Sequence, residues 1–392
     1  MTPATAAHPA AAVVGHPEGR RTALLQTALR NAGRTPARVV PWADVLSGTA
    51  RFRPGELVRL DSPGQDPLVD RLLRGTADPT RVEGGGRWYR GFLDAVHHVA
   101  DGVRTAGGTL LADPGELAVL FDKRLCHATL AAAGVPVPPS PTSGPDAPPV
   151  RGWPDLRALL ARPGLRRVFA KPAHGSSASG VLAVESGTGG RVRATTSVEL
   201  TPSGALHNSL RVRRYEDERT VGALVDALAP DGLHIERWLP KASQHGRAAD
   251  LRVVATAGRA THAVVRTSAG PLTNLHLGGS RGDLAAVREA LAAAPGTGWP
   301  GLLAVAEGAA AVFPGTPCVG VDLLPAVHWR RFAVAEVNAF GDLLPGLTGF
   351  EDGPAEGLDT YAAQVASPPW NPGAPCAPHH GRASAALAGA RP

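Results

Sequence analysis

Two apolar segments near the C-terminal end constrain this chain more than any other part of it. CVGVDLLP (318–325) and FAVAEVNAFGD (332–342) are separated by a short turn and therefore predict an antiparallel hairpin. A register centred on that turn places Asp322 opposite Glu336, and the two-residue period of a strand places Asn338 on the same face as Glu336. Three hard oxygen ligands then meet at one end of a sheet, which suits Mg²⁺ together with substrate phosphates. The alternative, an exposed strand face, is less favoured because both carboxylates lie inside apolar runs, where an unpaired charge is costly.

A second hairpin is predicted at ADLRVVATAGRATHAVVRTS (249–268). With a turn at Ala257-Gly258-Arg259, Asp250 and Arg252 lie on one face and Arg266 lies opposite Arg252. Two guanidiniums and a carboxylate would bind an anionic or phosphorylated group, although an exposed sheet face with an ion pair fits this hairpin equally well. The next segment, PLTNLHLGGSRG (271–282), favours the binding site, because it places Asn274 in a glycine-rich stretch that can approach phosphates.

Lysine is rare in this chain and is therefore informative. Of 40 basic residues only Lys123, Lys171 and Lys241 are lysine, which marks them as candidates for positions that need a compact ammonium group. Lys171 ends a predicted strand in FAKPAHGSSASGVLAV (169–184), and small residues follow it. Such a loop can wrap phosphate oxygens with backbone N–H groups, while a plain hairpin connection is the alternative. The small residues that would form the phosphate loop are Gly175, Ser176, Ser177 and Gly180.

The other two lysines have different settings. Lys123 starts a predicted helix, Phe121–Ala133, that leads into the proline-rich segment VPVPPSPTSGPDAPP (135–149). A solvent-facing helical lysine is the alternative there, but two of three lysines falling next to candidate phosphate-binding segments favours a function. Lys241 lies in a polar connection, LPKASQHG, and is expected at the surface.

Length and composition bound the class of protein. At 392 residues two to three domains are expected, and a 43% hydrophobic, 19% charged composition is that of a globular protein. Strands and helices alternate up to about residue 115, which predicts a parallel α/β unit. Three widely spaced cysteines support neither a disulfide framework nor a zinc site, so a reducing cytoplasm is expected. No apolar run is long enough to span a membrane, and the scattered arginines, with a net charge of +6, do not predict a nucleic-acid partner.

In several ordered motifs the chain resembles the ATP-grasp superfamily, over about residues 116 to 366. The motifs are DK followed by GVPVP, AKP with its Gly/Ser loop, IERWL (235–239), DLR, TNLHLGG, and Asp322 followed by EVN. IERWL resembles the hinge of D-alanine ligases, whereas TNLHLGG and EVN resemble ribosomal-protein glutamate ligases and glutathione-synthetase-like members. A weaker resemblance, which includes RLDSPG (59–64), is to an uncharacterised bacterial ATP-grasp group. AFGDLLPG after Asn338 departs from the family's small-residue N-x-x-P-G run.

The resemblance implies an α/β fold of three parts: an N-terminal parallel α/β domain (8–115), a small grasp lobe (116–235) and a large lobe with the metal site (236–366). The Pro, Ala and Gly composition that follows predicts a disordered tail (367–392). The resemblance also implies ATP and Mg²⁺ as cofactors and a role for each candidate residue. Lys123, Lys171 and the Gly175–Gly180 loop would bind phosphates with Asn274; Glu236, Arg237 and Leu239 would bind adenine, and Asp250 the ribose; Asp322, Glu336 and Asn338 would hold Mg²⁺; Arg252 and Arg266 would hold the developing acylphosphate.

The implied activity is that of an ADP-forming carboxylate-amine ligase acting through an acylphosphate. Two alternatives remain: a ligase that modifies a peptide or protein, and a non-catalytic nucleotide-binding regulator, which would be expected to lose the metal carboxylates that this chain keeps. Loops after parallel strands bind ligands in α/β units, so 16–19 and 61–64 are candidate acceptor loops, with ordinary turns as the alternative. The sequence identifies neither the acid nor the amine, nor the oligomeric state.

Overall fold

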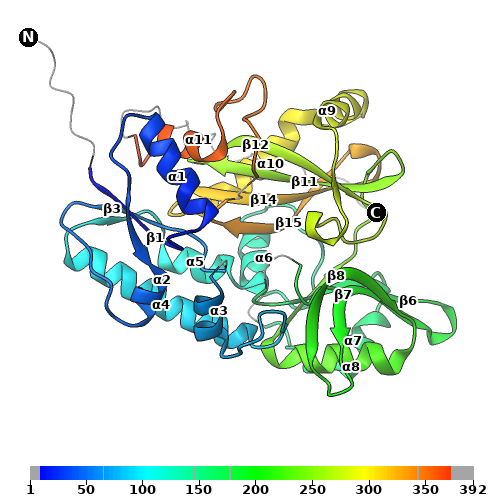
Figure 1. Ribbon diagram of the computed structural model, residues 1–392. Coiled ribbons are helices and arrows are strands. Elements are labelled where there is room, and N and C mark those ends of the chain that lie inside the picture. The colour runs from blue at the N-terminus through cyan, green and yellow to red at the C-terminus, as the bar shows by residue number, and fades with distance from the viewer. Residues whose placement is uncertain (1–8, 65, 145, 176–177, 342–343, 372–392) are drawn as a thin grey trace, which may run out of the picture.

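The structure is a computed structural model that describes residues 9–64, 66–144, 146–175, 178–341 and 344–371. Its strands form one four-stranded, one five-stranded and one six-stranded sheet. In Figure 1 the four-stranded sheet lies at the left, the five-stranded sheet at the lower right, and the six-stranded sheet across the upper half. We refer to them as the N-terminal, middle and third sheets, in chain order.

The N-terminal sheet is parallel throughout, as the alternation of strands and helices predicted. Its strand order is β2-β1-β3-β4, so β1 and β3 lie in the interior of the sheet. The strands are β1 (Ala11–Gly15), β2 (Arg38–Pro41), β3 (Leu57–Leu60) and β4 (Thr109–Leu110), and the helices are α1 (Arg20–Asn31), α2 (Trp42–Leu46), α3 (Pro67–Arg74), α4 (Gly85–Thr105) and α5 (Pro114–Leu120).

The two faces of this sheet are buried by different parts of the chain. One face packs against α2, α3, α4 and α5, around Phe92 and Leu117. The other face packs against α1 and against α11 (Thr360–Ala366), which contributes Tyr361 and Val365. Trp370 is only 3% exposed in the same cluster, and its carbonyl accepts a hydrogen bond of 2.6 Å from Arg34 Nη1. The prediction of a disordered tail from residue 367 is therefore wrong for residues 367–371, because the side chain of Trp370 is buried against the N-terminal sheet. Residues 372–392 of the predicted tail lie outside the described residues.

The middle sheet is antiparallel, with the strand order β8-β7-β6-β5-β9. Helices α7 and α8 bury their apolar stripes, including Leu156 and Leu224, against one face. The first helix of this region starts at Lys123 rather than Phe121, because the Asp122 side chain caps it. The elements are α6 (Lys123–Ala132), α7 (Trp153–Leu160), β5 (Arg167–Pro172), β6 (Leu182–Ser186), β7 (Val192–Leu200), β8 (Leu206–Tyr215), α8 (Glu218–Leu228) and β9 (Leu233–Arg237).

The third sheet has the order β13-β12-β11-β14-β15, with β10 beside β11. The sequence analysis predicted neither α9 nor α10. Helix α10 is apolar on almost every side, with Glu307 as its only charge, and so lacks an amphipathic period. The elements are β10 (Ser243–Gln244), β11 (Arg247–Thr256), β12 (Arg259–Ser268), β13 (Ser280–Arg281), α9 (Leu284–Ala293), α10 (Gly298–Ala311), β14 (Cys318–Pro325) and β15 (Phe332–Ala339).

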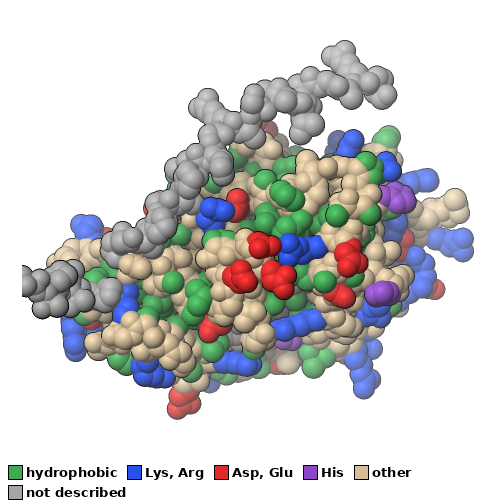
Figure 2. Space-filling view, turned by 90° about the horizontal axis from the view of Figure 1, so that it is seen from above, with side chains coloured by type: hydrophobic (Ala, Val, Ile, Leu, Met, Phe, Trp, Pro, Cys, Tyr) green, Lys and Arg blue, Asp and Glu red, His purple; other side chains and the backbone are tan. Residues whose placement is uncertain are grey.

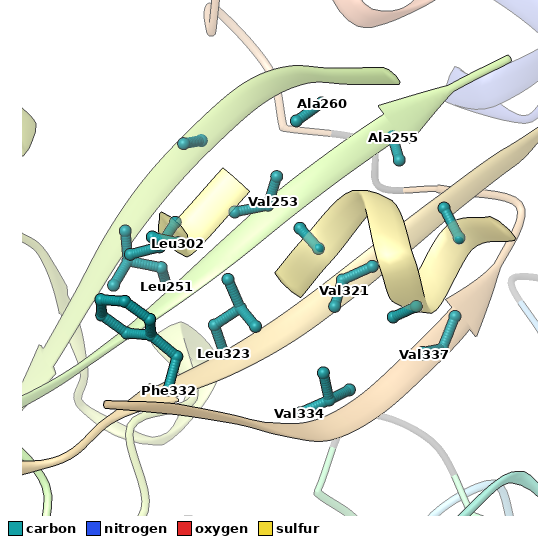
Figure 3. Close-up of a cluster of buried hydrophobic side chains, with 14 of the residues drawn as sticks. Leu251, Val253, Ala255, Ala260, Leu302, Val321, Leu323, Phe332, Val334 and Val337 are labelled. Atoms are coloured by element: carbon teal, nitrogen blue, oxygen red, sulfur yellow. The ribbon is translucent and has the colours of Figure 1, made fainter. Parts of the chain in front are cut away.

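The two faces of the third sheet have opposite character. Figure 3 shows Leu251, Val253, Val321 and Leu323 pointing with Leu302 of α10 into one apolar cluster. Because side chains alternate along a strand, their neighbours on β11 and β14, among them Asp250, Arg252 and Asp322, occupy the other face. Burial of the apolar face thus fixes which polar side chains are presented opposite it.

The register of the 250–268 hairpin differs from the prediction. Asp250, not Arg252, lies opposite Arg266, because the turn is the two-residue Ala257-Gly258 with positive φ at both positions, and a bulge follows Val254. The three side chains still share one face. In the 318–338 hairpin Asp322 lies opposite Glu336, as predicted, and a bulge beside Asp322 shifts the pairs nearer the turn by one residue.

The N-terminal and middle parts of the chain are joined by specific polar contacts. Asp231 accepts hydrogen bonds from the backbone N–H groups of Gly84 (2.6 Å) and Gly86 (3.0 Å), so it caps α4 from the other unit. The His174 ring stacks on Tyr89 of α4 with 4.0 Å between ring centroids. These contacts hold the segment that follows Lys171 against the N-terminal unit.

Surface charge and helix length test two of the expectations about partners. On the face drawn in Figure 2, acidic side chains gather near the centre with basic side chains beside them. This face therefore presents both signs of charge rather than a basic strip. Within the described ranges, no helix has both the length and the apolar character needed to cross a membrane.

Candidate active site

A cavity of about 930 Å³, open mouth included, is lined by β5 and β9 of the middle sheet and by the polar face of the third sheet. Its lining contains lysines, arginines, carboxylates, uncharged polar side chains such as Thr273, and apolar side chains such as Phe169 and Leu272. Most of the predicted site residues meet here. They are Lys123, Lys171, Gly175, Glu236, Leu239, Asp250, Arg252, Arg266, Asn274, Asp322, Glu336 and Asn338.

Lys171 and Glu236 form a buried ion pair at the wall made by the middle sheet. They lie on the neighbouring strands β5 and β9, with Nζ 2.6 Å from Oε1 and side chains only 11% and 2% exposed. Burial alone would raise the pKa of Glu236, but the ammonium of Lys171 outweighs it and lowers that pKa to about 2. Burial likewise opposes the charge of Lys171, and the facing carboxylates of Glu236 and Glu336 raise its pKa in spite of that. Both groups are therefore charged at neutral pH.

Lys123 reaches the cavity from the first turn of α6. Its Nζ lies 2.9 Å from Glu336 Oε1 and donates a hydrogen bond of 2.5 Å to the carbonyl of Gly175. Its own backbone N–H donates to the carbonyl of Ala173, which fixes the start of the helix beside the end of β5. The two lysines thus flank the segment that precedes the Gly/Ser loop.

Asp322 is held between two arginines on the polar face of the third sheet. Its carboxylate lies 2.5 and 2.8 Å from Arg252 nitrogens and 2.9 Å from Arg266 Nη2. Burial would raise the pKa of Asp322, but the Arg252 and Arg266 guanidiniums lower it to about 2. The carboxylate is therefore ionised, and both of its oxygens are held by the two arginines.

Glu336 and Asn338 follow on β15 with the spacing that the sequence predicted. Glu336 is the more open carboxylate, with 28% of its side chain exposed, and Asn338 Nδ2 donates a hydrogen bond of 3.1 Å to the carbonyl of Gly320. Asp322, Glu336 and Asn338 supply two carboxylates and an amide oxygen, which fits Mg²⁺ completed by phosphate oxygens. Within the described residues no group of three or more His, Cys, Asp or Glu side chains could hold a metal ion by itself.

The prediction that Lys241 lies at the surface is wrong. Its side chain is 7% exposed and its Nζ lies 3.2 Å from Asp250 Oδ2. Asp250 also accepts a 2.8 Å hydrogen bond from Arg266 and a close one from Thr273. The polar sequence around Lys241 suggested an exposed side chain. The argument that rare lysines mark functional positions, which was applied to Lys123 and Lys171, would have identified Lys241 as well.

The remaining predicted residues are placed less favourably or cannot be placed. Arg237 is exposed and does not line the cavity, although its backbone N–H donates a 2.8 Å hydrogen bond to Pro139. Gly180 has a φ of 74°, and a Cβ there would lie 2.5 Å from the Pro172 ring, so the chain requires glycine for a packing reason. Ser176 and Ser177 lie outside the described residues.

Comparison with known proteins gives structural relatives only. No protein-family model matches the chain, and no curated protein matches its sequence. The crystal structure of the D-cycloserine synthetase DcsG is similar with a TM-score of 0.51 and 20% identity, over 85% of this chain and 92% of that one. The N5-carboxyaminoimidazole ribonucleotide synthetase PurK, solved as an ADP complex, gives 0.50 and 11%, over 86% and 71%. The ATP-grasp ligase PsnB, solved with a variant of its minimal precursor, Mg and ADP, gives 0.49 and 17%, over 91% and 96%.

Proposed function

We propose that this chain, which has the ATP-grasp fold, is an ATP-dependent carboxylate-amine ligase. In the proposed reaction a substrate carboxylate oxygen attacks the γ-phosphorus of ATP and ADP leaves. An amine nitrogen then attacks the acyl carbon of the acylphosphate, phosphate leaves, and an amide is formed. The chain supplies positioning and charge rather than a covalent nucleophile.

The observation that carries this proposal is the distribution of charge in the cavity. Lys123, Lys171, Arg252 and Arg266 all line it, and each contacts a carboxylate of the same cavity. A polyphosphate with its metal ion brings both signs of charge and can exchange with these ion pairs without leaving buried charges unpaired. An ordinary structural ion-pair network would not also line an open cavity of this size.

Each residue then has a role that follows from its place. Lys123 and Lys171, which both lie beside the segment that precedes the Gly/Ser loop, bind phosphates, and Mg²⁺ held by Asp322, Glu336 and Asn338 would neutralise the phosphate charge. Arg252 and Arg266 lie beside Asp322 and hold the oxygens of the developing acylphosphate.

The adenine and ribose assignments change in detail. The Glu236 side chain is occupied by Lys171, so adenine is bound by the backbone around 236–239 and by apolar side chains, including Leu239 and Leu272. The two oxygens of Asp250 are occupied by Arg266, Lys241 and Thr273. We assign Asp250 to positioning Arg266 rather than to the ribose. Asn274, whose side chain accepts from the His276 N–H, stays a phosphate-side residue.

The proposal is tested by ADP release from MgATP across a panel of amino acids and peptides, with the variant Glu336→Gln. This variant should keep the fold, because Glu336 is partly exposed. It should lose turnover, because it removes a carboxylate that would hold Mg²⁺. Glu307→Gln, which alters a carboxylate on α10 outside the cavity, is the matched control. Wild-type rates of ADP release by folded Glu336→Gln would contradict the metal-site assignment. A panel in which only peptides support release would identify a peptide ligase.

A further inference from the structure

A second cavity lies where the N-terminal sheet meets the third sheet. It has about 30 Å³ of space for water-sized groups, a fifth of the 150 Å³ in the first cavity, and it is bounded by β3, β11, β14 and the C-terminal segment. Its lining is mostly apolar, from residues such as Leu117, Phe340 and Trp370. Among the residues that line it, Arg59 on the interior strand β3 is the one with a charged side chain.

Arg59 is an incompletely satisfied buried charge. The residue is 6% exposed, and Nη1 makes a close hydrogen bond to Gln364 Oε1. Its guanidinium lies over the Tyr361 ring, 5.4 Å from the centroid. Nε and Nη2 are buried and have no hydrogen-bond partner among the described residues. A buried guanidinium with two unpaired hydrogen-bond donors is costly, which indicates a ligand that accepts from them.

Asp61 and Arg21 are charged groups near this cavity. Asp61, 1% exposed, lies 3.6 Å from Arg21 Nη1, and its Oδ1 accepts a 2.9 Å hydrogen bond from the Ser62 N–H. Arg21 also donates to the carbonyl of Phe340. Among the described residues the hydrogen-bond partner of Arg59, Gln364, is neutral. A negative group that accepts from Nε and Nη2 would complete the hydrogen bonds of Arg59.

The two cavities lie on the same face of the third sheet. Cys318 lines the second cavity and Asp322 the first, four residues apart on β14, with only Gly320 between them on that face. On β15, Asn338 lines the first cavity, and Phe340, two residues on, lines the second. At about 3.3 Å per residue these lining residues are roughly 7 to 13 Å apart. The Arg252 side chain packs over Gly320 between them. That distance is the span from the amino nitrogen to the carboxylate of a dipeptide or tripeptide, or of a long diamino acid.

We propose that Arg59 binds the free carboxylate of the amine substrate, with its nucleophilic nitrogen reaching the first cavity. This rests on the proposed ligase function and names the class of acceptor: an amino acid or short peptide with a free C-terminal carboxylate. The candidate loop 61–64 begins at Asp61, two residues after Arg59, and the loop 16–19 is followed by Arg21. Both candidate acceptor loops therefore lie beside the second cavity.

The test is binding calorimetry on the full chain with free amino acids, alanine di- and tripeptides and diamino acids, each against its carboxamide. At least one free acid should bind at least ten-fold more tightly than its amide. Arg59→Gln should remove that preference and Arg59→Lys should keep part of it, with MgATP affinity unchanged in both. Equal binding of acid and amide, a preference that survives Arg59→Gln, or a panel that does not bind while MgATP does would overturn the proposal. Loss of MgATP binding in the wild type would instead refute the ligase function.

A second variant keeps the test decisive if Arg59→Gln does not fold. Gln364→Glu places a carboxylate on Arg59 from within the chain, so it should preserve the fold and abolish the preference for the free acid. Gln26→Glu makes the same change on α1 outside the cavity, where Gln26 bonds the backbone of Ala37, and should leave the preference intact. If Gln364→Glu binds acid and amide as the wild type does, water alone hydrates Arg59 and the proposal is wrong.

Discussion

The Lys171–Glu236 pair gives the most direct test of how the site is held before substrate binds. Glu236→Gln keeps the size of the side chain but removes the carboxylate that lies 2.6 Å from Lys171 Nζ. It leaves a buried ammonium whose remaining carboxylate neighbours already serve other cations. We expect the variant to be less stable than the wild type when no nucleotide is bound.

The magnitude follows from the pKa of Glu236. Its fall from 4.5 to about 2 corresponds to about 3 kcal/mol of preference for the ionised form in the folded chain. Removal of one partner of a buried pair costs roughly 3 to 5 kcal/mol in general, which agrees. Since the folded pKa is depressed, this stability is fully present above about pH 4.5 and is lost as the pH falls toward 2.

The assay is urea unfolding, followed by tryptophan fluorescence, with and without MgATP. The Glu236→Gln curve should lie at lower urea by the equivalent of about 3 kcal/mol. Saturating MgATP should reduce the difference in unfolding free energy between Glu236→Gln and the wild type, because phosphate replaces the missing negative charge. The double variant Glu236→Gln with Lys171→Met should be more stable than Glu236→Gln alone, because it removes the orphaned charge.

Two results would refute this reasoning. One is a Glu236→Gln curve that coincides with the wild type; the other is a double variant that loses the sum of the two single losses. Glu307→Gln removes a half-exposed pair with Arg259 and should cost under about 1 kcal/mol, so it reports what a surface pair is worth in the same chain.

Three further outcomes are expected. Lys171→Ala should weaken MgATP binding by roughly 1.5 to 3 kcal/mol, the scale of a charged hydrogen bond, and unchanged affinity by calorimetry would remove Lys171 from the phosphate site. Asp231→Ala should cost about 1 to 2 kcal/mol in urea unfolding, because it uncaps α4, and a shift near zero would mean that water replaces the cap. Burial lowers the pKa values of His174, His234 and His262 below 6.5, so stability should fall as the pH drops through 6.5; a urea midpoint that rises from pH 7.5 to pH 5.5 would contradict this.

The sequence predicted those parts of the site that local patterns determine. Asp322 faces Glu336 as the predicted hairpin required, although a bulge beside Asp322 shifts the pairs nearer the turn by one residue. The register of β11 and β12 was missed by two residues, because a bulge after Val254 and the conformation of Ala257 are not encoded in that alternation.

Contacts between distant parts of the chain were the least predictable. Arg59 on its strand carries no sign that Gln364, 305 residues later, covers it. Lys241 lies among polar residues and is buried only because Asp250 and Thr273 converge on it. Such burial depends on tertiary packing, for which a single sequence has no periodic signal.

The covering of the N-terminal sheet by α11 has a consequence for synthesis on the ribosome. The strands that emerge first, β1 and β3, have one face completed by Tyr361, Val365 and Trp370, which emerge near the end. At 5 to 20 residues per second the interval from residue 60 to residue 370 is roughly 15 to 60 s. During that time an apolar surface with Arg59 on it is open to chaperones and proteases. A chain truncated before residue 360 would keep that surface exposed permanently, so intactness of the C-terminal helix is a condition for the first sixty residues to be protected from degradation.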